Sequence, residues 1–232
     1  MEENVHVLYE DKTLLVLHKP ADLVVNISVT QKERTLQHFL QDYFSLSDQG
    51  IGGRAGIVHR LDKETSGILV VAKTQKAFEN LQEQFQKRTV VKKYLALVHG
   101  VMAQEKGSIH EPLARNPFNR TKYGVFAGGR DALTEYAVKE RFPSFTLLQV
   151  TPKTGRTHQI RVHLKYIGFS VVGDEVYAGR KTARDDRRWC PRQFLHAFFL
   201  EITHPETGKR MHFEDPLPTD LQQALATLQN KK

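Results

Sequence analysis

The sequence has only one cysteine, Cys190, among its 232 residues. A single thiol cannot form an intramolecular disulfide, and it cannot supply the several cysteines of a Cys-based zinc site. The longest strongly apolar run, residues 68–72, is far too short to span a bilayer. The opening stretch MEENVHV is acidic and lacks the apolar core of a signal peptide. These absences predict a cytoplasmic protein that does not insert into a membrane.

Familiar cofactor and hydrolase motifs are also missing. GIGGRA at residues 50–55 has the spacing of a dinucleotide-binding loop, but a polar, helix-like stretch precedes it where a strand is required. His158 and His163 are five residues apart, which does not place two metal ligands on one face of a helix. No GxSxG serine elbow occurs. None of these patterns supports a metal, nucleotide or redox cofactor.

The charge balance is basic. Lysine and arginine outnumber aspartate and glutamate by 34 to 26, which gives a net charge of +8. Such an excess favours a polyanionic partner, although many basic proteins bind none. Two stretches, residues 114–130 and 179–192, mix basic with aromatic residues in a way that suits phosphate contacts and base stacking. Solvated surface charge is the alternative explanation for both loops.

Hydrophobic periodicity predicts an α+β fold with a mainly antiparallel sheet. We expect hairpins at residues 5–18 and 194–213, further strands at 90–100 and within 132–150, and a single domain over residues 1–232. Expected helices cover residues 34–44, 75–88, 157–167 and 218–229, the last with Thr219 as N-cap. In the third helix His158, Arg161 and Lys165 should form a basic face, and Gly168 should end the helix.

The segment GIVHRLDKETSGILVVAKT, residues 56–74, reads as two apolar strands with a polar junction. Strand alternation would place Arg60 and Asp62 on one face. From spacing alone, Asp62 could be a nucleophile or part of a structural salt bridge. Asp62 and Glu64 could also form the carboxylate pair of a hydrolase.

Three stretches resemble the signature segments of the RluA-type RNA pseudouridine synthase family: HRLDKETSG (59–67), KKYLALVHG (92–100) and TPKTGRTHQIRVHL (151–164). The hairpins at residues 8–25 and 195–208 resemble the family's first and last hairpins, so the resemblance covers nearly the whole chain in the family's order. His59 favours the RluA type over the sister family centred on small-subunit RNA, which usually has glycine there.

The resemblance implies an α+β catalytic domain with a mixed, mainly antiparallel sheet, a few flanking helices and a central RNA-binding cleft. The implied enzyme is an isomerase that flips a uridine out of structured RNA and converts it to pseudouridine. It implies that Asp62 attacks the nucleoside, that Tyr94 packs on the uracil and helps proton transfer, and that Arg161 pairs with the aspartate. It also implies that Arg60 fills the gap left by the base. Ile160 and Leu195 fall at apolar positions near the pocket, where ordinary core packing is the alternative.

The expected partner is RNA, ribosomal first and transfer RNA second, with no DNA or membrane and with a monomer as the default. Phosphate contacts are expected from Arg115, Arg120, Lys122, Arg130 and Arg156, the last beside a helix start capped by Thr154 or Thr157. We expect no accessory RNA-binding domain before the first strand. Asp22 and Asn26 depart from the family pattern. A catalytically silent RNA chaperone on the same fold is the alternative function.

Overall fold

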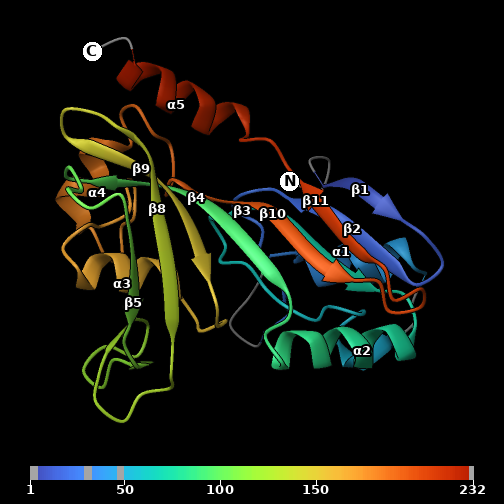
Figure 1. Ribbon diagram of the computed structural model, residues 1–232. Helices are drawn as coiled ribbons and strands as arrows, with labels where there is room; N and C mark the ends of the chain where they lie inside the picture. Colours follow the sequence, from blue (N-terminus) through green and yellow to red (C-terminus); the bar gives the residue numbers. More distant parts are fainter. Residues whose placement is uncertain (1–4, 29–32, 46–49, 230–232) are drawn as a thin grey trace. The chain divides into compact units, whose positions relative to one another are not determined.

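The structure of the protein is a computed structural model, which describes residues 5–28, 33–45 and 50–229 (Figure 1). The chain forms two compact units. Unit 1 comprises Met1–Val91 and Ala197–Asp215, and unit 2 comprises Lys92–His196 and Pro216–Lys232. Both units combine helices with antiparallel strand pairs, which confirms the α+β class. The expectation of one catalytic domain over the whole chain stays a prediction.

Unit 1 is built on a sheet in the order β1-β2-β3-β10, with β11 paired to β10. The strands are β1 (His6–Glu10), β2 (Leu14–Lys19), β3 (Ser66–Ala72), β10 (Leu195–Thr203) and β11 (Arg210–Glu214). β1 with β2 and β10 with β11 form the two predicted hairpins, each antiparallel. Gly67 on β3 has a φ of +123°, and a Cβ there would lie 2.3 Å from the carbonyl oxygen of Ala197. Only glycine therefore lets β3 approach β10 so closely.

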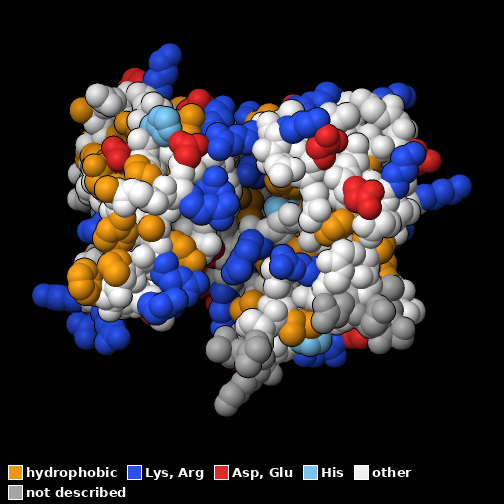
Figure 2. Space-filling model, turned by 90° about the horizontal axis from the view of Figure 1, so that it is seen from below, with side chains coloured by type: hydrophobic (Ala, Val, Ile, Leu, Met, Phe, Trp, Pro, Cys, Tyr) orange, Lys and Arg blue, Asp and Glu red, His pale blue; other side chains and the backbone are white. Residues whose placement is uncertain are grey.

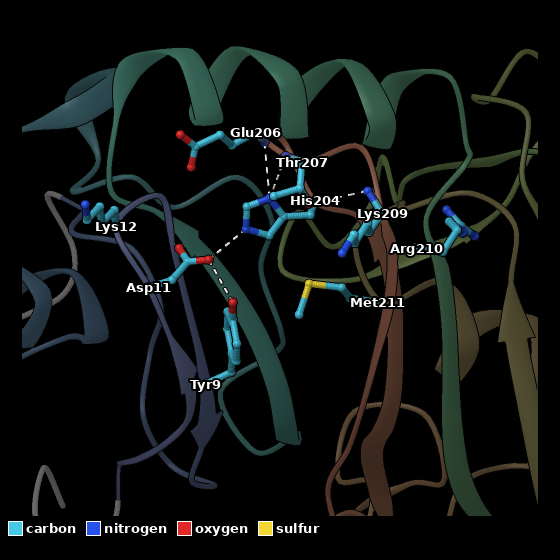
Figure 3. A pocket seen from close by; sticks show the side chains of 9 residues that line it. All are labelled: Tyr9, Asp11, Lys12, His204, Glu206, Thr207, Lys209, Arg210 and Met211. Carbon is cyan, nitrogen blue, oxygen red and sulfur yellow. Dashed lines mark hydrogen bonds and ion pairs between the residues drawn. The ribbon is translucent and has the colours of Figure 1, made fainter.

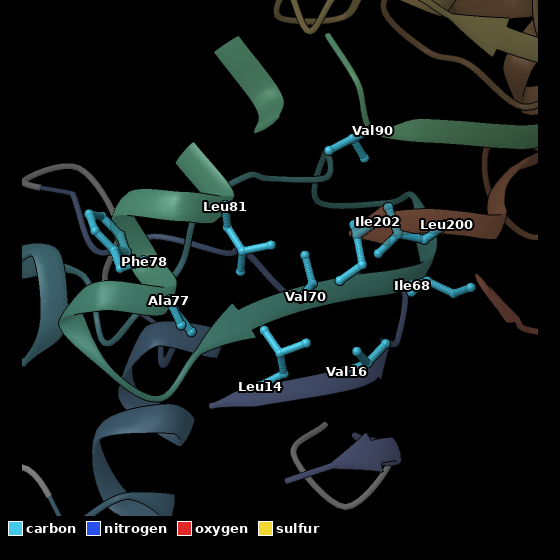
Figure 4. Close-up of a cluster of buried hydrophobic side chains, with 11 residues drawn as sticks. Leu14, Val16, Ile68, Val70, Ala77, Phe78, Leu81, Val90, Leu200 and Ile202 are labelled. Carbon is cyan, nitrogen blue, oxygen red and sulfur yellow. The ribbon is translucent and has the colours of Figure 1, made fainter. Parts of the chain in front are cut away.

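Helices cover both faces of this sheet, which explains why β2 and β3 are buried at nearly every position. Helix α2 (Gln75–Gln86) packs against the even-numbered residues of these strands, among them Val16 and Val70 (Figure 4). Helix α1 (Leu36–Tyr43) packs against odd-numbered residues such as Leu17 and Leu69. The side chains of Thr35 and Thr74 cap these two helices. A short 3₁₀ helix, η2 (Ile51–Gly53), precedes β3.

Unit 2 is built on the antiparallel strands β4-β9-β8-β5, with β6 and β7 forming a separate two-stranded hairpin. The strands are β4 (Val91–His99), β5 (Lys106–His110), β6 (Leu113–Arg115), β7 (Tyr123–Val125), β8 (Leu133–Arg141) and β9 (Phe145–Pro152). The predicted strands at 90–100 and within 132–150 are confirmed as β4, β8 and β9. The short strands β5 to β7 were not predicted, because their sequences lack sustained alternation.

The described part of unit 2 contains the helices α3 (Gln159–Tyr166), α4 (Arg180–Asp186) and α5 (Thr219–Gln229). α3 ends at the predicted place, with Gly168 at a φ of +92° just beyond it. The helix α4 replaces part of the loop expected at residues 179–192. The carbonyl of Pro218 accepts the amide hydrogens of Leu221 and Gln222, so Pro218 takes the cap position and the prediction of Thr219 as N-cap is wrong.

Candidate active site

The segment that carries Asp62 is not the strand that alternation predicted. Ile57 forms an isolated antiparallel bridge with Val71, and residues 58–62 then run without regular structure. The chain turns at residues 63–64, and the amide of Thr65 donates to the carbonyl of Asp62 at 3.1 Å. Arg60 is exposed, Leu61 is buried and Asp62 is half-buried. We call residues 57–65 the aspartate segment.

A histidine ring explains why the aspartate segment leaves the sheet. Nε2 of His59 accepts the backbone N–H of Val70 on β3 at 3.0 Å, in place of a strand carbonyl. The same ring stacks on Phe85 of α2, with centroids 4.7 Å apart. The Val70 amide is therefore satisfied without a paired strand, which leaves the backbone around Asp62 free to adopt another path.

A buried lysine holds the other end of the aspartate segment. Lys19, at the end of β2, has 0% exposure. Its Nζ donates to the carbonyl oxygens of Pro20, Leu23 and Lys63 at 2.6, 2.8 and 3.0 Å. An ammonium has three hydrogens to donate, and these carbonyls take all three. Because the last carbonyl belongs to the residue after Asp62, Lys19 fixes the turn next to the candidate nucleophile.

Tyr94 lies on β4 in unit 2, opposite Val150 of β9, and is 9% exposed. Lys92 is two residues earlier and thus on the same side of the strand. Its Nζ lies 3.5 Å from the carbonyl oxygen of Thr154. Burial lowers the pKa of Lys92 to about 8. No sequence pattern singled out Lys92, since a lysine on a strand is usually a solvated charge.

The loop before α3 is organised by Gln159. Its Oε1 accepts the Thr154 hydroxyl at 2.6 Å and the Arg156 amide at 3.0 Å. The residue at the N-cap position is His158, in a left-handed conformation with φ of 56° and no side-chain cap hydrogen bond. The prediction that Thr154 or Thr157 caps this helix is therefore wrong.

Arg161 is buried in unit 2 instead of lying on a basic face, so that expectation is wrong for this residue. It is 5% exposed, and its Nε and Nη2 donate to the two carboxylate oxygens of Asp174 at 2.7 and 2.9 Å. The guanidinium also lies over the ring of Tyr177, 5.0 Å from its centroid. This bidentate, stacked arrangement fixes the plane of the guanidinium. The implied pairing of Arg161 with Asp62 stays a prediction.

The predicted RNA contacts are mostly solvent-accessible. Arg115, Arg120 and Arg130 are exposed and Lys122 is partly exposed, all on or beside the β6–β7 hairpin. Nε of Arg156 donates to the carbonyl of Asp131, which ties the loop before α3 to the start of β8. Basic side chains outnumber acidic ones on the face shown in Figure 2.

Several other positions considered from the sequence are buried or make contacts within unit 2. Ile160 and Leu195 are both buried in unit 2, and their proposed place near the pocket stays a prediction. In the second basic stretch, Trp189 packs on Phe145 and Arg192 pairs with Asp220 of α5. These contacts turn part of that stretch inward.

The histidine and cysteine that the sequence raised as possible functional residues, His163 and Cys190, are both buried. His163 is buried between the hydroxyl of Thr134 and the carbonyl of Glu111, and burial lowers its pKa. Burial raises the pKa of the Cys190 thiol to about 12, which makes it a poor nucleophile. Over residues 5–28, 33–45 and 50–229, no three His, Cys, Asp or Glu side chains gather as metal ligands would. Within the same ranges, every helix is too short or too polar to span a bilayer.

An open pocket of about 550 Å³ lies at the turns of the two hairpins of unit 1 (Figure 3). At its base, Asp11 accepts hydrogen bonds from Tyr9, from Thr13 and from Nε2 of His204. Nδ1 of His204 accepts the amides of Glu206 and Thr207. This Asp11–His204 clamp superficially resembles a catalytic dyad. Its hydrogen bonds instead join two turns, so we interpret it as structural.

Comparisons with known proteins agree with the resemblance seen in the sequence. A family model described as RNA pseudouridylate synthase matches residues 13–166. The chain is 44% identical to ribosomal large subunit pseudouridine synthase D of Pseudomonas aeruginosa, over 97% of this chain and 72% of that protein. It is 42% identical to the uncharacterized RNA pseudouridine synthase YlyB of Bacillus subtilis, over 96% and 72%. Human RNA pseudouridylate synthase domain containing 1 has a similar structure, with a TM-score of 0.75 and 29% identity over 94% of this chain and 85% of that one.

Proposed function

Because this chain belongs to the RNA pseudouridylate synthase family and is thus an RNA-modifying isomerase, we propose that it converts specific uridines of structured RNA to pseudouridine. Ribosomal RNA is the first expected substrate, since the names of several relatives refer to the large ribosomal subunit. Transfer RNA is the second candidate. The observation that carries the proposal is the aspartate segment, which presents a half-buried Asp62 on a backbone held by Lys19 and His59.

In the proposed reaction the Asp62 carboxylate attacks the target nucleoside and the C1′–N1 bond breaks. The uracil rotates, C5 bonds to C1′, and the carboxylate leaves. The hydrogen on C5 is lost as a proton and N1 is protonated, so the product is an isomer with no net change in atoms. No external oxidant, reductant or group donor is required, in keeping with the absence of cofactor motifs in the sequence.

Two residues of unit 2 serve the same reaction in this proposal. Tyr94 offers a flat ring for the uracil and a hydroxyl for proton transfer. Arg161 supplies a cation that remains charged when buried, held in one plane by Asp174. A lysine at this position could not be fixed in the same way, because it lacks the planar, two-pronged donor set.

The exposed Arg60 lies next to Leu61 in the aspartate segment and has room to enter an RNA stack. Extruding a base costs a few kcal/mol of lost stacking and pairing. An inserted guanidinium could recover part of that cost. The basic residues of the β6–β7 hairpin would bind the surrounding phosphates. The monomeric state and cytoplasmic location expected from the sequence stay predictions.

The function is tested by incubating the protein with bulk RNA from a strain that lacks the gene, followed by pseudouridine mapping. We expect new pseudouridines at a small number of positions. A protein that binds this RNA without forming pseudouridine would favour the chaperone alternative. Release of free base or sugar would favour a hydrolase that uses Asp62 and Glu64.

A further inference from the structure

Tyr177 lies in a turn that is organised by the same carboxylate that holds Arg161. Oδ1 of Asp174 accepts the amides of Val176 and Tyr177 at 2.9 and 3.1 Å. The amide of Ala178 donates to the Asp174 carbonyl and closes the turn. The position of Tyr177 is therefore fixed relative to Arg161 by a buried ionic group.

The ring and the hydroxyl of Tyr177 contact different residues. The ring lies under the Arg161 guanidinium, at 5.0 Å. The hydroxyl lies 2.8 Å from Nδ1 of His158 and 3.1 Å from the backbone nitrogen of Tyr123. One phenol oxygen can donate to His158 and accept from Tyr123 at the same time. It thus joins the start of α3 to strand β7.

Tyr123 is the first residue of β7 and so belongs to the β6–β7 hairpin, which carries the basic residues. Arg115 of β6 lies over its ring at 5.4 Å and donates to its hydroxyl at 3.1 Å. The Tyr123 ring also meets His158 edge to face, with centroids 5.8 Å apart. A small cluster of Leu113, Ala132 and Val162 supports Tyr123 and Tyr177 from the apolar side. A continuous set of contacts therefore runs from Arg115 through Tyr123 and Tyr177 to Arg161.

We infer that Tyr177 is a positioning residue that connects the RNA-binding hairpin β6–β7 to Arg161. The hydroxyl holds the hairpin, and the ring holds the guanidinium. This inference rests on the proposed function, in which the hairpin binds RNA and Arg161 serves the reaction. The hydroxyl and the ring therefore have separate consequences, which are distinguished by removing the hydroxyl alone and then the hydroxyl together with the ring.

The test compares Tyr177→Phe with Tyr177→Leu on the RNA that wild-type protein modifies. Tyr177→Phe loses two hydrogen bonds and should raise the Kd for RNA about fivefold to tenfold. Its single-turnover rate at saturating RNA should stay within about twofold of wild type. Tyr177→Leu should show the same rise in Kd and a rate lowered more than about tenfold, because the guanidinium loses its stacking surface.

The matched control is Tyr166→Phe, an exposed tyrosine on α3, which should change neither quantity. Thermal unfolding of each variant sets an assay temperature at which all are folded. Equal losses of rate in Tyr177→Phe and Tyr177→Leu would overturn the inference, as would an unchanged Kd for Tyr177→Phe. If wild-type protein binds RNA but forms no pseudouridine, the proposed function fails, and the Kd of Tyr177→Phe for that RNA still decides whether the hydroxyl holds the hairpin.

Discussion

The aspartate segment in unit 1 and the surroundings of Arg161 in unit 2 position a charged side chain in opposite ways. In the aspartate segment the anchors hold the backbone: Lys19 binds the carbonyl after Asp62, and His59 replaces a strand partner. Around Arg161 the anchors hold the side chain itself, through Asp174 and Tyr177.

This difference fits the tasks proposed for the two residues. A nucleophile must move toward its target and form a bond, so fixing its backbone while leaving the carboxylate half-buried suits that role. An arginine that stabilises charge works best when its guanidinium is pre-oriented and does not reorganise. The comparison predicts that damage to either set of anchors lowers activity, by loosening the backbone in one case and the side chain in the other.

The largest effect on stability is expected from Asp174→Ala. It leaves the buried Arg161 cation without its carboxylate and should cost about 3–5 kcal/mol of unfolding free energy. Urea denaturation measures this cost. Asp185→Ala is the matched control, because Asp185 is exposed in a surface pair, and it should cost less than about 1 kcal/mol. Equal costs for the two variants would contradict the account of Arg161.

Lys19→Met should come next, at about 2–4 kcal/mol, since three carbonyls lose the buried ammonium that donates to them. The isomerisation rate at saturating RNA should also fall at least about tenfold, because the turn beside Asp62 loosens. The control is Lys12→Met, an exposed lysine in the turn of the first hairpin. An unchanged rate in a folded Lys19→Met protein would show that the backbone anchor does not position Asp62.

A smaller effect, about 1–2 kcal/mol, is expected from His59→Phe. The replacement ring can still stack on Phe85 but cannot accept the Val70 amide hydrogen. Hydrogen exchange at the Val70 amide should therefore quicken. The amide of Val16, its partner on β2, serves as the internal reference. Unchanged exchange at Val70 in the variant would argue against the histidine as a strand substitute.

The smallest effect concerns Asp11→Asn in the Asp11–His204 clamp. Burial opposes ionisation of Asp11, but hydrogen bonds from His204, Thr13, Leu14 and Tyr9 outweigh it and hold the pKa of this carboxyl well below its usual range. A lowered pKa contributes stability above the unfolded-state value of about 3.9, and this stability is lost as the pH falls below it. Wild type should exceed the variant by about 1 kcal/mol at neutral pH, with the gap narrowing below about pH 4.

Denaturant titrations over a pH series measure that gap. The isomerisation rate of Asp11→Asn should match wild type, because the clamp joins turns and does not act on RNA. A gap that stays constant down to low pH would contradict the ionised clamp. A large loss of rate without a loss of stability would mean that the clamp belongs to the reaction.

The sequence predicted most of the fold because the core strands and helices have clear hydrophobic patterns. The alternating and continuous apolar runs of β2 and β3 and the helical period of α2 could be read directly. Alternation failed for residues 58–62, since it cannot show that the ring of His59 takes a hydrogen bond from Val70. Helical periodicity did not predict α4, because this short, polar helix has too few buried side chains to form an apolar pattern.

The candidate residues came from resemblance, and their surroundings could not be foreseen. The sequence predicted Arg161 on an exposed basic face, because helical periodicity identifies buried positions only where they are apolar. Its carboxylate partner lies 13 residues away, in a stretch with no regular pattern. Lys19 similarly reads as the polar end of a strand, although it is fully buried. Pairings of this kind depend on tertiary structure and leave no periodic signal.

The role of Asp62 is tested most directly by comparing Asp62→Asn with Glu64→Gln in a single-turnover assay on the RNA that wild-type protein modifies. If Asp62 is the nucleophile, Asp62→Asn should lose more than about a thousandfold in rate while still binding RNA. Glu64→Gln should stay within about threefold of wild type. Pseudouridine formed by Asp62→Asn at the wild-type rate, or lost in Glu64→Gln alone, would contradict the assignment of Asp62 as nucleophile.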